Sequence, residues 1–270
     1  MSGTASRYAP IVDDMVWSYS RLRSFEQCKH KWYLKYILYA DNKVVEPETL
    51  FFSEYGKLVH RILADEYRGI IMRSEALQIY MKRFKLMKSR APSYKIYRSY
   101  YESGLNHFLR DLPFSDAKVL GVESEMRWES DGRPFIGYID LHIENGDGEK
   151  ELCVIDHKSR TLSQRSKRAK PTKKDLELDE YFTQLYLYSK PIALQYGQFP
   201  AKLCFNCFRS GEIIQEEFSE EKYEAANEWA RGTISEIRCE EEFAPDIDWF
   251  RCKHLCDMHG YCSYYQLNGW

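Results

Sequence analysis

The sequence is organised around Leu152-Cys-Val-Ile-Asp-His-Lys-Ser159, a short apolar run that ends in charge. The apolar half predicts a buried strand. Because side chains alternate along a strand, Asp156 and Lys158 should point to one face and His157 to the other. A carboxylate beside an ammonium group suits a site in which the acid holds a divalent metal ion and the lysine contacts a phosphate. Taken alone the pattern is weak, because Asp-x-Lys more often marks a strand end with a solvated ion pair.

The composition favours a folded globular protein. Of the 270 residues, 44% are hydrophobic and 15% aromatic, which is enough to build a sizeable core and argues against disorder. The net charge of −2 means that a nucleic-acid partner would have to be met by a local basic patch. No apolar run approaches the roughly 20 residues of a membrane span, and the N-terminus has no signal-peptide core. We therefore expect a soluble, cytoplasmic protein with no membrane partner.

Three strands are predicted in the middle of the chain. Residues 119–128 alternate in polarity, residues 135–143 follow a turn at Asp131-Gly132, and the strand of the central stretch follows a second turn at 145–148. Short turns of this kind join antiparallel neighbours, so the pattern predicts a three-strand meander. With helices before and after it, the fold class is α/β of the α+β type, with helices flanking a central sheet.

Asp140 lies in the middle of the second of these strands, among apolar neighbours. A carboxylate buried there without compensation would be costly, so its presence indicates a metal ion or another cation beside it. Asp140 and Asp156 are on adjacent strands, so they can meet at one end of the sheet.

The first half of the chain predicts helices. Residues 1–16 are typical of a loose leader, and apolar residues at helical spacing over 17–36 predict a helix with Ser20 as its N-cap. A second helix is expected over 53–67, with Ser53 as its cap and His60 one turn after Gly56.

Residues 74–112 predict two more helices, broken at residues 91–93. They carry many Tyr, Lys and Arg residues, which suit either a DNA-facing surface or a solvated face, and the sequence does not decide between them. A later helix over 176–190 places Gln184 and Tyr188 on one face, with Tyr181 a turn earlier.

The remaining elements are a hairpin over 201–218 and a charged helix over 220–238. Cys204 and Cys207 lie on the first hairpin strand, and we interpret them as core residues despite their C-x-x-C spacing.

Residues 160–174 form a basic, polar segment directly after the Asp156/Lys158 pair. This composition is typical of a mobile loop. Its place beside a candidate phosphate site favours contacts to a nucleic-acid backbone. The candidate DNA-binding residues are Arg160, Arg165, Lys167, Arg168, Lys170, Lys173 and Lys174.

The C-terminal segment 250–265 contains three cysteines within eleven residues: Cys252, Cys256 and Cys262. Such clustering is typical of metal ligands, and a closed site needs a fourth. His254 or His259 would complete a local zinc site. Cys28, from the other end of the chain, would instead favour an iron–sulfur cluster.

Together these residues resemble the RecB-like branch of the PD-(D/E)XK nuclease superfamily, in particular the CRISPR-associated RecB-like exonucleases, their phage relatives and the AddB iron–sulfur nuclease domain. Four degenerate motifs occur in the order of that branch: G-x-x-x-H, G-x-x-D, D/E-x-K and Q-x-x-x-Y. They are matched, in that order, by Gly56 with His60, Gly137 with Asp140, Asp156 with Lys158, and Gln184 with Tyr188. A further strand glutamate of the family is matched by Glu123 or Glu125, and the motifs do not distinguish the two.

The family also carries an N-terminal S-x-S-x-L…C helix and three C-terminal cysteines that bind a [4Fe-4S] cluster. The matching residues are Ser18, Ser20, Leu22 and Cys28, then Cys252, Cys256 and Cys262. The resemblance thus implies a restriction-endonuclease-like core with a mixed sheet, whose N- and C-terminal parts are joined by the cluster. It also implies one nuclease domain over 17–270, with a helical insertion at about 70–115.

The resemblance implies a metal-dependent DNA exonuclease that acts on single strands or DNA ends, in phage-type recombination, repair or CRISPR spacer acquisition. Mg²⁺ or Mn²⁺ would be held by His60, Asp140, Asp156 and the His157 carbonyl. Lys158 would orient the attacking water, Gln184 and Tyr188 would brace the site, and Glu123 or Glu125 would hold a second ion or orient Lys158. Further partners would be a second copy of the chain or a recombination protein.

Three other functions compete with this one. The first is a non-catalytic DNA-binding or recombination module that keeps the fold and cluster. The second is a zinc-binding interaction protein in which the acids are incidental. The third is a nuclease that acts on RNA, because such a metal site does not itself select the sugar.

Overall fold

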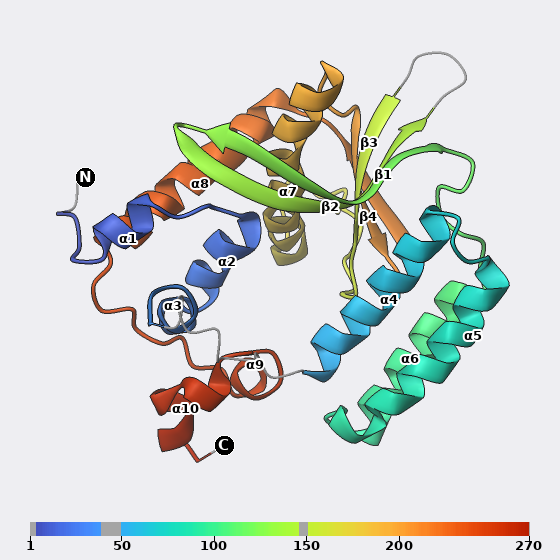
Figure 1. The fold of residues 1–270 in the computed structure, drawn as a ribbon, viewed down its shortest axis with the longest axis horizontal. Coiled ribbons are helices and arrows are strands. Elements are labelled where there is room, and N and C mark those ends of the chain that lie inside the picture. The colour runs from blue at the N-terminus through green and yellow to red at the C-terminus, as the bar shows by residue number, and fades with distance from the viewer. Residues whose placement is uncertain (1–3, 39–49, 146–150, 270) are drawn as a thin grey trace. The chain divides into compact units, whose positions relative to one another are not determined.

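The computed structural model describes residues 4–38, 50–145 and 151–269 (Figure 1). The expected turn at 145–148 lies outside these residues from position 146 on, as do positions 1–3 of the expected leader. Four helices begin the described chain: α1 (Ala9–Asp13), α2 (Tyr19–Gln27), α3 (Lys29–Tyr33) and the π-helix η1 (Leu34–Leu38). They are followed by α4 (Phe51–Tyr67), α5 (Arg73–Phe84), the 3₁₀-helix η2 (Lys85–Arg90) and α6 (Tyr94–Phe108).

The strands are β1 (Lys118–Ser130), β2 (Arg133–Asn145), β3 (Glu151–His157), β4 (Lys202–Cys207) and β5 (Glu212–Glu217). The long helix α7 (Lys173–Tyr196) connects β3 to β4, and α8 (Glu220–Cys239) follows β5. The described chain ends with α9 (Trp249–His254), the 3₁₀-helix η3 (His259–Tyr261) and α10 (Ser263–Leu267). None of the described helices is both long enough and apolar enough to cross a bilayer.

The sheet has five strands in the order β1-β2-β3-β4-β5. β2 and β3 are antiparallel, β3 and β4 parallel, and β4 and β5 antiparallel, which confirms a central mixed sheet that contains the meander order. Asp131 and Gly132 both have positive φ angles, of 52° and 71°, as a tight type I′ hairpin turn requires. The parallel step from β3 to β4 needs a crossover, and α7 supplies it.

The described chain forms two compact units, each made from separate segments of the sequence. The first unit takes residues up to Ser53, residues Trp128–Ile136 and residues from Asn227 onward; the second takes Glu54–Arg127 and Gly137–Ala226. The single domain expected over 17–270 stays a prediction.

The first unit brings the two ends of the chain together. The segment expected to be a loose leader includes α1, whose Val12 is fully buried, and Trp17 pairs through its backbone with Pro134 and Ile136. At the other end, Asp257 forms ion pairs with Lys31 and Lys35, each at 2.8 Å. These contacts fasten the α3–η1 region to the cysteine-rich C-terminal segment.

Two expected helix caps are wrong. Ser18, not Ser20, caps α2, because Ser18 has extended backbone angles and its hydroxyl accepts a hydrogen bond from the Arg21 N–H at 3.2 Å. The expected helix over 17–36 is also interrupted at Cys28, whose extended backbone ends α2 and whose thiol accepts from the N–H of Lys31. In the next helix Ser53 is not a cap, because α4 already begins at Phe51.

The second unit holds most of the sheet, with α4, α7 and the α5–α6 hairpin. Figure 1 shows α5 and α6 running side by side, which confirms the two helices expected over 74–112, and Ser93 caps α6. The ring of Tyr55 on α4 contacts those of Phe84 and Phe208, so aromatic packing joins the hairpin to the helix that carries His60. Cys204 and Cys207 are buried on β4, as expected of core residues.

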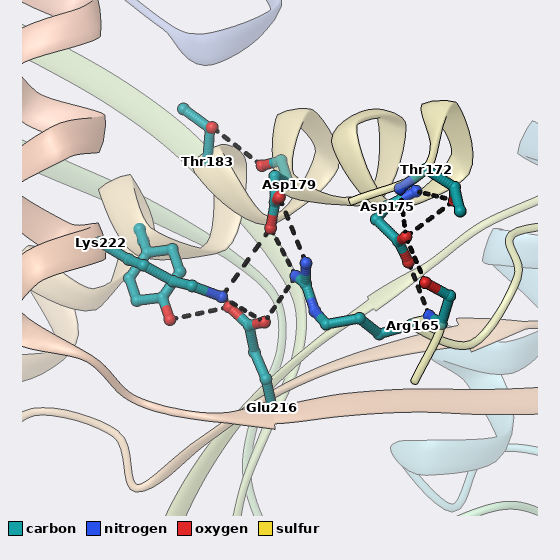
Figure 2. A network of polar contacts seen from close by, with 9 residues as sticks. Arg165, Thr172, Asp175, Asp179, Thr183, Glu216 and Lys222 are labelled. Carbon is teal, nitrogen blue, oxygen red and sulfur yellow. Dashed lines mark hydrogen bonds and ion pairs between the residues drawn. The ribbon is translucent and has the colours of Figure 1, made fainter. Parts of the chain in front are cut away.

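The basic segment 160–174, whose composition is typical of a mobile loop, is anchored to the rest of the unit at several positions. Leu162 is buried, and the side chain of Gln164 donates a hydrogen bond to the carbonyl of Ile213. Figure 2 shows Arg165 paired with Asp179 and, at 3.3 Å, with Glu216. Local composition cannot reveal this arrangement, because the partners come from α7 and β5.

Asp175 is the second anchor of this segment, and its carboxylate accepts four hydrogen bonds (Figure 2). Two come from the N–H and hydroxyl of Ser166, both at 2.7 Å, and two from Thr172, which caps α7. These hydrogen bonds, those of Ser166 first, hold the pKa of Asp175 well below its usual range. The carboxylate therefore joins the start of α7 to the basic segment.

Asp175→Asn is expected to lower the melting temperature at pH 7, because an amide cannot accept all four hydrogen bonds. A carboxylate with a depressed folded-state pKa stabilises the protein above its unfolded pKa, which is about 3.9 for Asp. That stability is lost as the pH falls through the folded pKa, so the difference from wild type should shrink below about pH 4. Thermal unfolding at several pH values tests this. A difference that is constant with pH, or as large in the exposed-acid control Asp111→Asn, would contradict it.

A candidate metal and phosphodiester site

The acids of the candidate site lie at the end of the β2–β3 ladder. Leu141 pairs with Ile155, so the next position in this register places Asp140 across from Asp156, as the sequence predicts. Both carboxylates are buried, with exposed fractions of 8% and 5%. A side chain at Gly137 would lie 2.5 Å from the ring of Tyr188, so this strand position needs glycine to let the tyrosine approach.

His60, Glu123 and Asp140 form a group of metal-ligating side chains. One ligand atom from each lies within 4.8 Å of the others. The Nδ1 atom of His60 is 3.4 Å from Asp140 Oδ2 and 3.9 Å from Glu123 Oε1. α4 contributes the histidine and two neighbouring strands contribute the acids, so the group exists only in the folded second unit.

Glu123, rather than Glu125, faces this group. Glu123 has a φ angle of 50°, a left-handed conformation that is uncommon for a residue with a side chain and that breaks the regular alternation of β1. Glu125 instead accepts hydrogen bonds from Tyr138 and Arg127 at an exposed position. Regular alternation over 119–128 would place both glutamates on one face of the strand, but the left-handed backbone at Glu123 interrupts that alternation.

Asp156, Lys158, Gln184 and Tyr188 form a polar chain beside the group. Lys158 Nζ lies 2.8 Å from Asp156 Oδ2 and donates to Gln184 Oε1, also at 2.8 Å. The amide of Gln184 donates in turn to Asp156 Oδ1 at 2.8 Å and to the hydroxyl of Tyr188 at 3.2 Å. The D-x-K and Q-x-x-x-Y residues are thus in contact, with Gln184 fixing both the acid and the lysine.

His157 borders the site through its main chain. Its N–H donates to Asp140 Oδ2 at 2.7 Å, while its buried imidazole stacks on Tyr67 and has Nδ1 at 3.1 Å from the amide nitrogen of Asn206. Burial lowers the pKa of this imidazole to about 4, so the ring is neutral. The imidazole is therefore a packing group, and a metal contact through its carbonyl stays part of the proposal below.

The electrostatics of the site reflect crowded acids. Burial disfavours the charged form of His60, but attraction to Asp140 and two further carboxylates outweighs burial and raises the pKa of the imidazole to about 9. Burial opposes ionisation of Asp140, yet His60 and the His157 N–H hold its pKa at about 2. Burial and the neighbouring Asp140 charge raise the pKa of Glu123. Burial likewise raises the pKa of Asp156, with Lys158 opposing that rise.

These observations fit a divalent cation. The carboxylates of Asp140, Asp156 and Glu123 all act on the imidazole of His60, and Lys158 is the ion-pair partner of Asp156 Oδ2. A cation would offset the burial and the repulsion from Asp140 that together raise the pKa of Glu123 and Asp156. Oxygen ligands suit Mg²⁺ or Mn²⁺, and the histidine favours Mn²⁺.

Three cations that the sequence analysis did not single out lie beside the metal-ligand group. Lys57 and Arg61 lie one turn apart on α4, and Arg68 directly follows its last residue. With His60 and Glu123 they line an open cavity of about 570 Å³. Their helical spacing was a usable signal, but only the fold shows that this face adjoins the acids. Gly56 also lines the cavity, yet a Cβ there would come no closer than 3.9 Å to Ser159, so close approach does not explain this glycine.

The predicted DNA-binding cations of the basic segment divide into two groups. Arg160 contacts Glu177 and the hydroxyl of Tyr181, and Arg165 contacts Asp179 and Glu216, so both carry intramolecular partners. The others are exposed in the described structure: Lys167, Arg168, Lys170, Lys173 and Lys174. Their contact with DNA stays a prediction.

In the first unit, the four predicted cluster cysteines line one small cavity of about 30 Å³. Cys28 reaches it from the start of α3, and Cys252, Cys256 and Cys262 reach it from the C-terminal segment. Burial raises the pKa of Cys256 to about 11 and also raises the pKa of Cys262, and a thiol must lose its proton to bind a metal ion. Four thiols around one cavity suit a metal cluster. His259 also lines the cavity, whereas His254 is not among the lining residues. Of the two histidines considered as a fourth zinc ligand, His259 is therefore the one beside the cysteines.

Comparison with solved structures identifies the fold. The crystal structure of a “Putative exonuclease” from Eubacterium rectale aligns with a TM-score of 0.50 and 14% sequence identity, over 99% of this chain and 98% of that one. The solved structure of SSO0001 aligns over 77% of this chain and 96% of that chain, at 16% identity and a TM-score of 0.31. The first alignment and the helix-flanked mixed sheet are consistent with a restriction-endonuclease-like fold.

Comparison with curated proteins gives no match. The family model of the PD-(D/E)XK nuclease superfamily, however, matches residues 16–263, which include both the metal-ligand group and the Asp156/Lys158 pair. The chain belongs to the PD-(D/E)XK nuclease superfamily.

Proposed function

We propose that this nuclease is a metal-dependent DNA exonuclease that hydrolyses phosphodiester bonds on single strands or at DNA ends. The observation that carries the proposal is the side-by-side placement of the His60–Glu123–Asp140 group and the Asp156–Lys158 ion pair. Taken alone, the first could be a solvated cluster of polar side chains and the second an ordinary ion pair at the end of a strand. Placed together, with Asp140 and Asp156 buried at the end of one sheet, they would provide metal ligands and a phosphate-binding cation at the same place.

A bound divalent ion would supply Lewis-acid chemistry, polarising the scissile phosphodiester and making water a better nucleophile. His60, Glu123 and Asp140 would hold it, with Asp156 and the His157 carbonyl completing the set. Lys158, steadied by Gln184, would orient the attacking water and offset charge that develops on the phosphate. The hydroxyl of Tyr188 stays neutral, because burial raises its pKa above the usual range, so it braces Gln184 as a neutral group.

The proposals that the substrate is DNA and that cleavage proceeds from an end rest on fewer observations than the proposal of metal-dependent hydrolysis. The E. rectale protein with the same fold is named as an exonuclease, and the RecB-like motifs resemble those of DNA exonucleases in recombination, repair and spacer acquisition. The intact acids and lysine favour an enzyme over a non-catalytic DNA-binding module. The exposed cations on α4 and the basic segment would follow the backbone of the substrate.

The first test compares wild type with Lys158→Ala on end-labelled single- and double-stranded DNA, with Mn²⁺ or Mg²⁺. Wild type is expected to degrade DNA only with a metal, and the variant is expected to lose at least about a hundredfold in rate, as when a group that stabilises the transition state is removed. End-labelled RNA of the same sequence tests the choice of sugar. Absence of cleavage by wild type under both metals, with DNA still bound, would support the non-catalytic module instead.

A matched pair of variants tests which glutamate belongs to the site. Glu123→Gln removes a carboxylate from the metal-ligand group and is expected to weaken Mn²⁺ binding by about tenfold or more. Glu125→Gln changes an exposed acid two residues away and should bind the ion as wild type does. Isothermal titration of Mn²⁺ measures both. Equal affinities for the two variants would remove Glu123 from the ligand set.

We further propose that Cys28, Cys252, Cys256 and Cys262 hold a [4Fe-4S] cluster with a structural role. The support is that thiols from both ends of the chain line one cavity, beside the ion pairs of Asp257 with Lys31 and Lys35. A metal link between residues so far apart in sequence restricts the unfolded chain strongly. Zinc held by three cysteines and His259 is the alternative.

Cys252→Ser should therefore lower the iron content, the visible absorbance and the melting temperature of anaerobically purified protein. Cys239→Ser is the matched control, because Cys239 lies outside the cavity-lining set. Iron analysis and thermal unfolding measure the effect. One equivalent of zinc and no iron in the wild-type protein would replace the cluster with a zinc site.

A further inference from the structure

The helical insertion formed by α5, η2 and α6 carries an unusual charge for this chain. Residues 73–110 contain nine Lys or Arg residues and only two Asp or Glu residues, although the whole chain has a net charge of −2. The insertion is therefore a local basic surface on an otherwise acidic protein. Composition left open whether this surface faces a nucleic acid or only solvent, and the arrangement of its aromatic side chains bears on that choice.

A row of tyrosines on α6 lines an open groove of about 440 Å³ on this insertion. Tyr94, Tyr97 and Tyr101 follow one another at helical spacing of three and four residues, so their rings share one face of α6. The rings of Tyr94 and Tyr97 are nearly parallel, with centroids 6.4 Å apart and 26° between their planes. The row thus offers successive flat faces along one edge of the groove.

Cations lie beside the row. Lys85 and Arg98 line the same groove, and both are exposed. Arg98 is paired with Glu102, but both side chains are more than half exposed, so the pair is weak and a phosphate could displace the carboxylate. Flat aromatic faces interleaved with exposed cations are the two features that single-stranded nucleic acid requires of a binding surface.

The tyrosine row is firmly supported from below. The buried ring of Phe84 lies 5.0 Å from that of Tyr97 and 5.5 Å from that of Tyr101. Tyr80, also buried, stacks on Tyr101 with 15° between the ring planes. Tyr94, by contrast, is 68% exposed, which leaves its ring available to a ligand. Supported rings lose little side-chain entropy on binding, which favours stacking.

Aromatic contacts also connect the row to the candidate metal site within the same unit. Phe84 touches Tyr55 of α4, Tyr55 touches Phe208, and Phe208 touches the ring of His60. Every centroid separation in this series lies between 5.7 and 6.1 Å. The row and the metal-ligand group are therefore parts of one packed body.

We propose that the Tyr94–Tyr97–Tyr101 face of α6 is a stacking platform that binds single-stranded DNA as it is fed to the metal site. The proposal rests on the proposed nuclease function for the identity of the strand, and it adds a separate binding site to it. A duplex would not use the rings, because its bases are already stacked and paired. A protein partner is the competing occupant, and the surplus of positive charge favours the polyanion.

The test is binding of a fluorescent single-stranded oligothymidylate to Lys158→Ala protein, which cannot degrade the probe under the proposed function. Tyr94→Ala, and separately Tyr97→Ala with Tyr101→Ala, are introduced into that background and measured by fluorescence anisotropy. Each lost base–ring contact is expected to weaken binding by at least about fivefold. Binding of a duplex of the same length should change less than twofold.

Two controls separate stacking from charge and from misfolding. Replacing Tyr97 and Tyr101 by Phe keeps the rings and should retain single-strand binding. Leu109→Ala changes an exposed residue outside the groove-lining set and should leave binding as it was. Tyr94→Ala removes a largely exposed ring, so its effect does not depend on repacking the core.

The outcomes distinguish this inference from the nuclease proposal. Suppose that wild type degrades DNA but the alanine variants bind the single strand as tightly as their parent. The stacking proposal is then wrong while the nuclease proposal is supported, and a protein partner becomes the expected ligand of this face of α6. If wild type does not degrade DNA and the alanine variants lose single-strand binding, the stacking proposal is supported and the protein is a non-catalytic DNA-binding protein. An equal loss of duplex and single-strand binding would also overturn stacking as the mode of recognition.

Discussion

The candidate site depends on the burial of two carboxylates on neighbouring strands. Asp140 and Asp156 lie across from each other at the end of the β2–β3 ladder, where solvent cannot screen their repulsion. The surrounding side chains compensate this charge from two directions. His60 and the His157 N–H face Asp140, and Lys158 and Gln184 face Asp156. A divalent ion would complete the compensation on the side where Glu123 adds a third negative charge.

The site is built by long-range connections rather than by one continuous segment. The histidine comes from α4, the acids from β1, β2 and β3, and the bracing amide from α7. Because β3 and β4 are parallel, the chain needs a crossover connection between them, and α7 forms it. This connection places Gln184 and Tyr188 beside the end of β3. The first unit is similarly non-local, because residues from 28–34 and residues from 245–265 line the same cavity.

Sequence reasoning predicted which of these side chains lie together more reliably than it described the backbone around them. The motif pairs Asp156 with Lys158 and Gln184 with Tyr188 do meet, because fixed spacings on a strand and a helix determine which side chains share a face. The same reasoning failed at Glu123, where a left-handed residue breaks the alternation, and at Ser20 and Ser53, where the true helix starts lie earlier. A strand irregularity and a helix start depend on tertiary packing that no local pattern records.

The sequence by itself determined the meander, the helix that follows it and the pairing of Asp156 with Lys158, since these follow from periodicity, turn residues and motif spacing. The order of the motifs along the chain indicated the family. Only the tertiary structure decided which glutamate faces the metal-ligand group and that Arg165 of the basic segment is bound to Asp179 and Glu216. It also placed Lys57, Arg61 and Arg68 beside the acids and gathered Tyr94, Tyr97 and Tyr101 along one groove. The physical reason is that burial and charge compensation are set by neighbours in space, and most of these neighbours are distant in sequence.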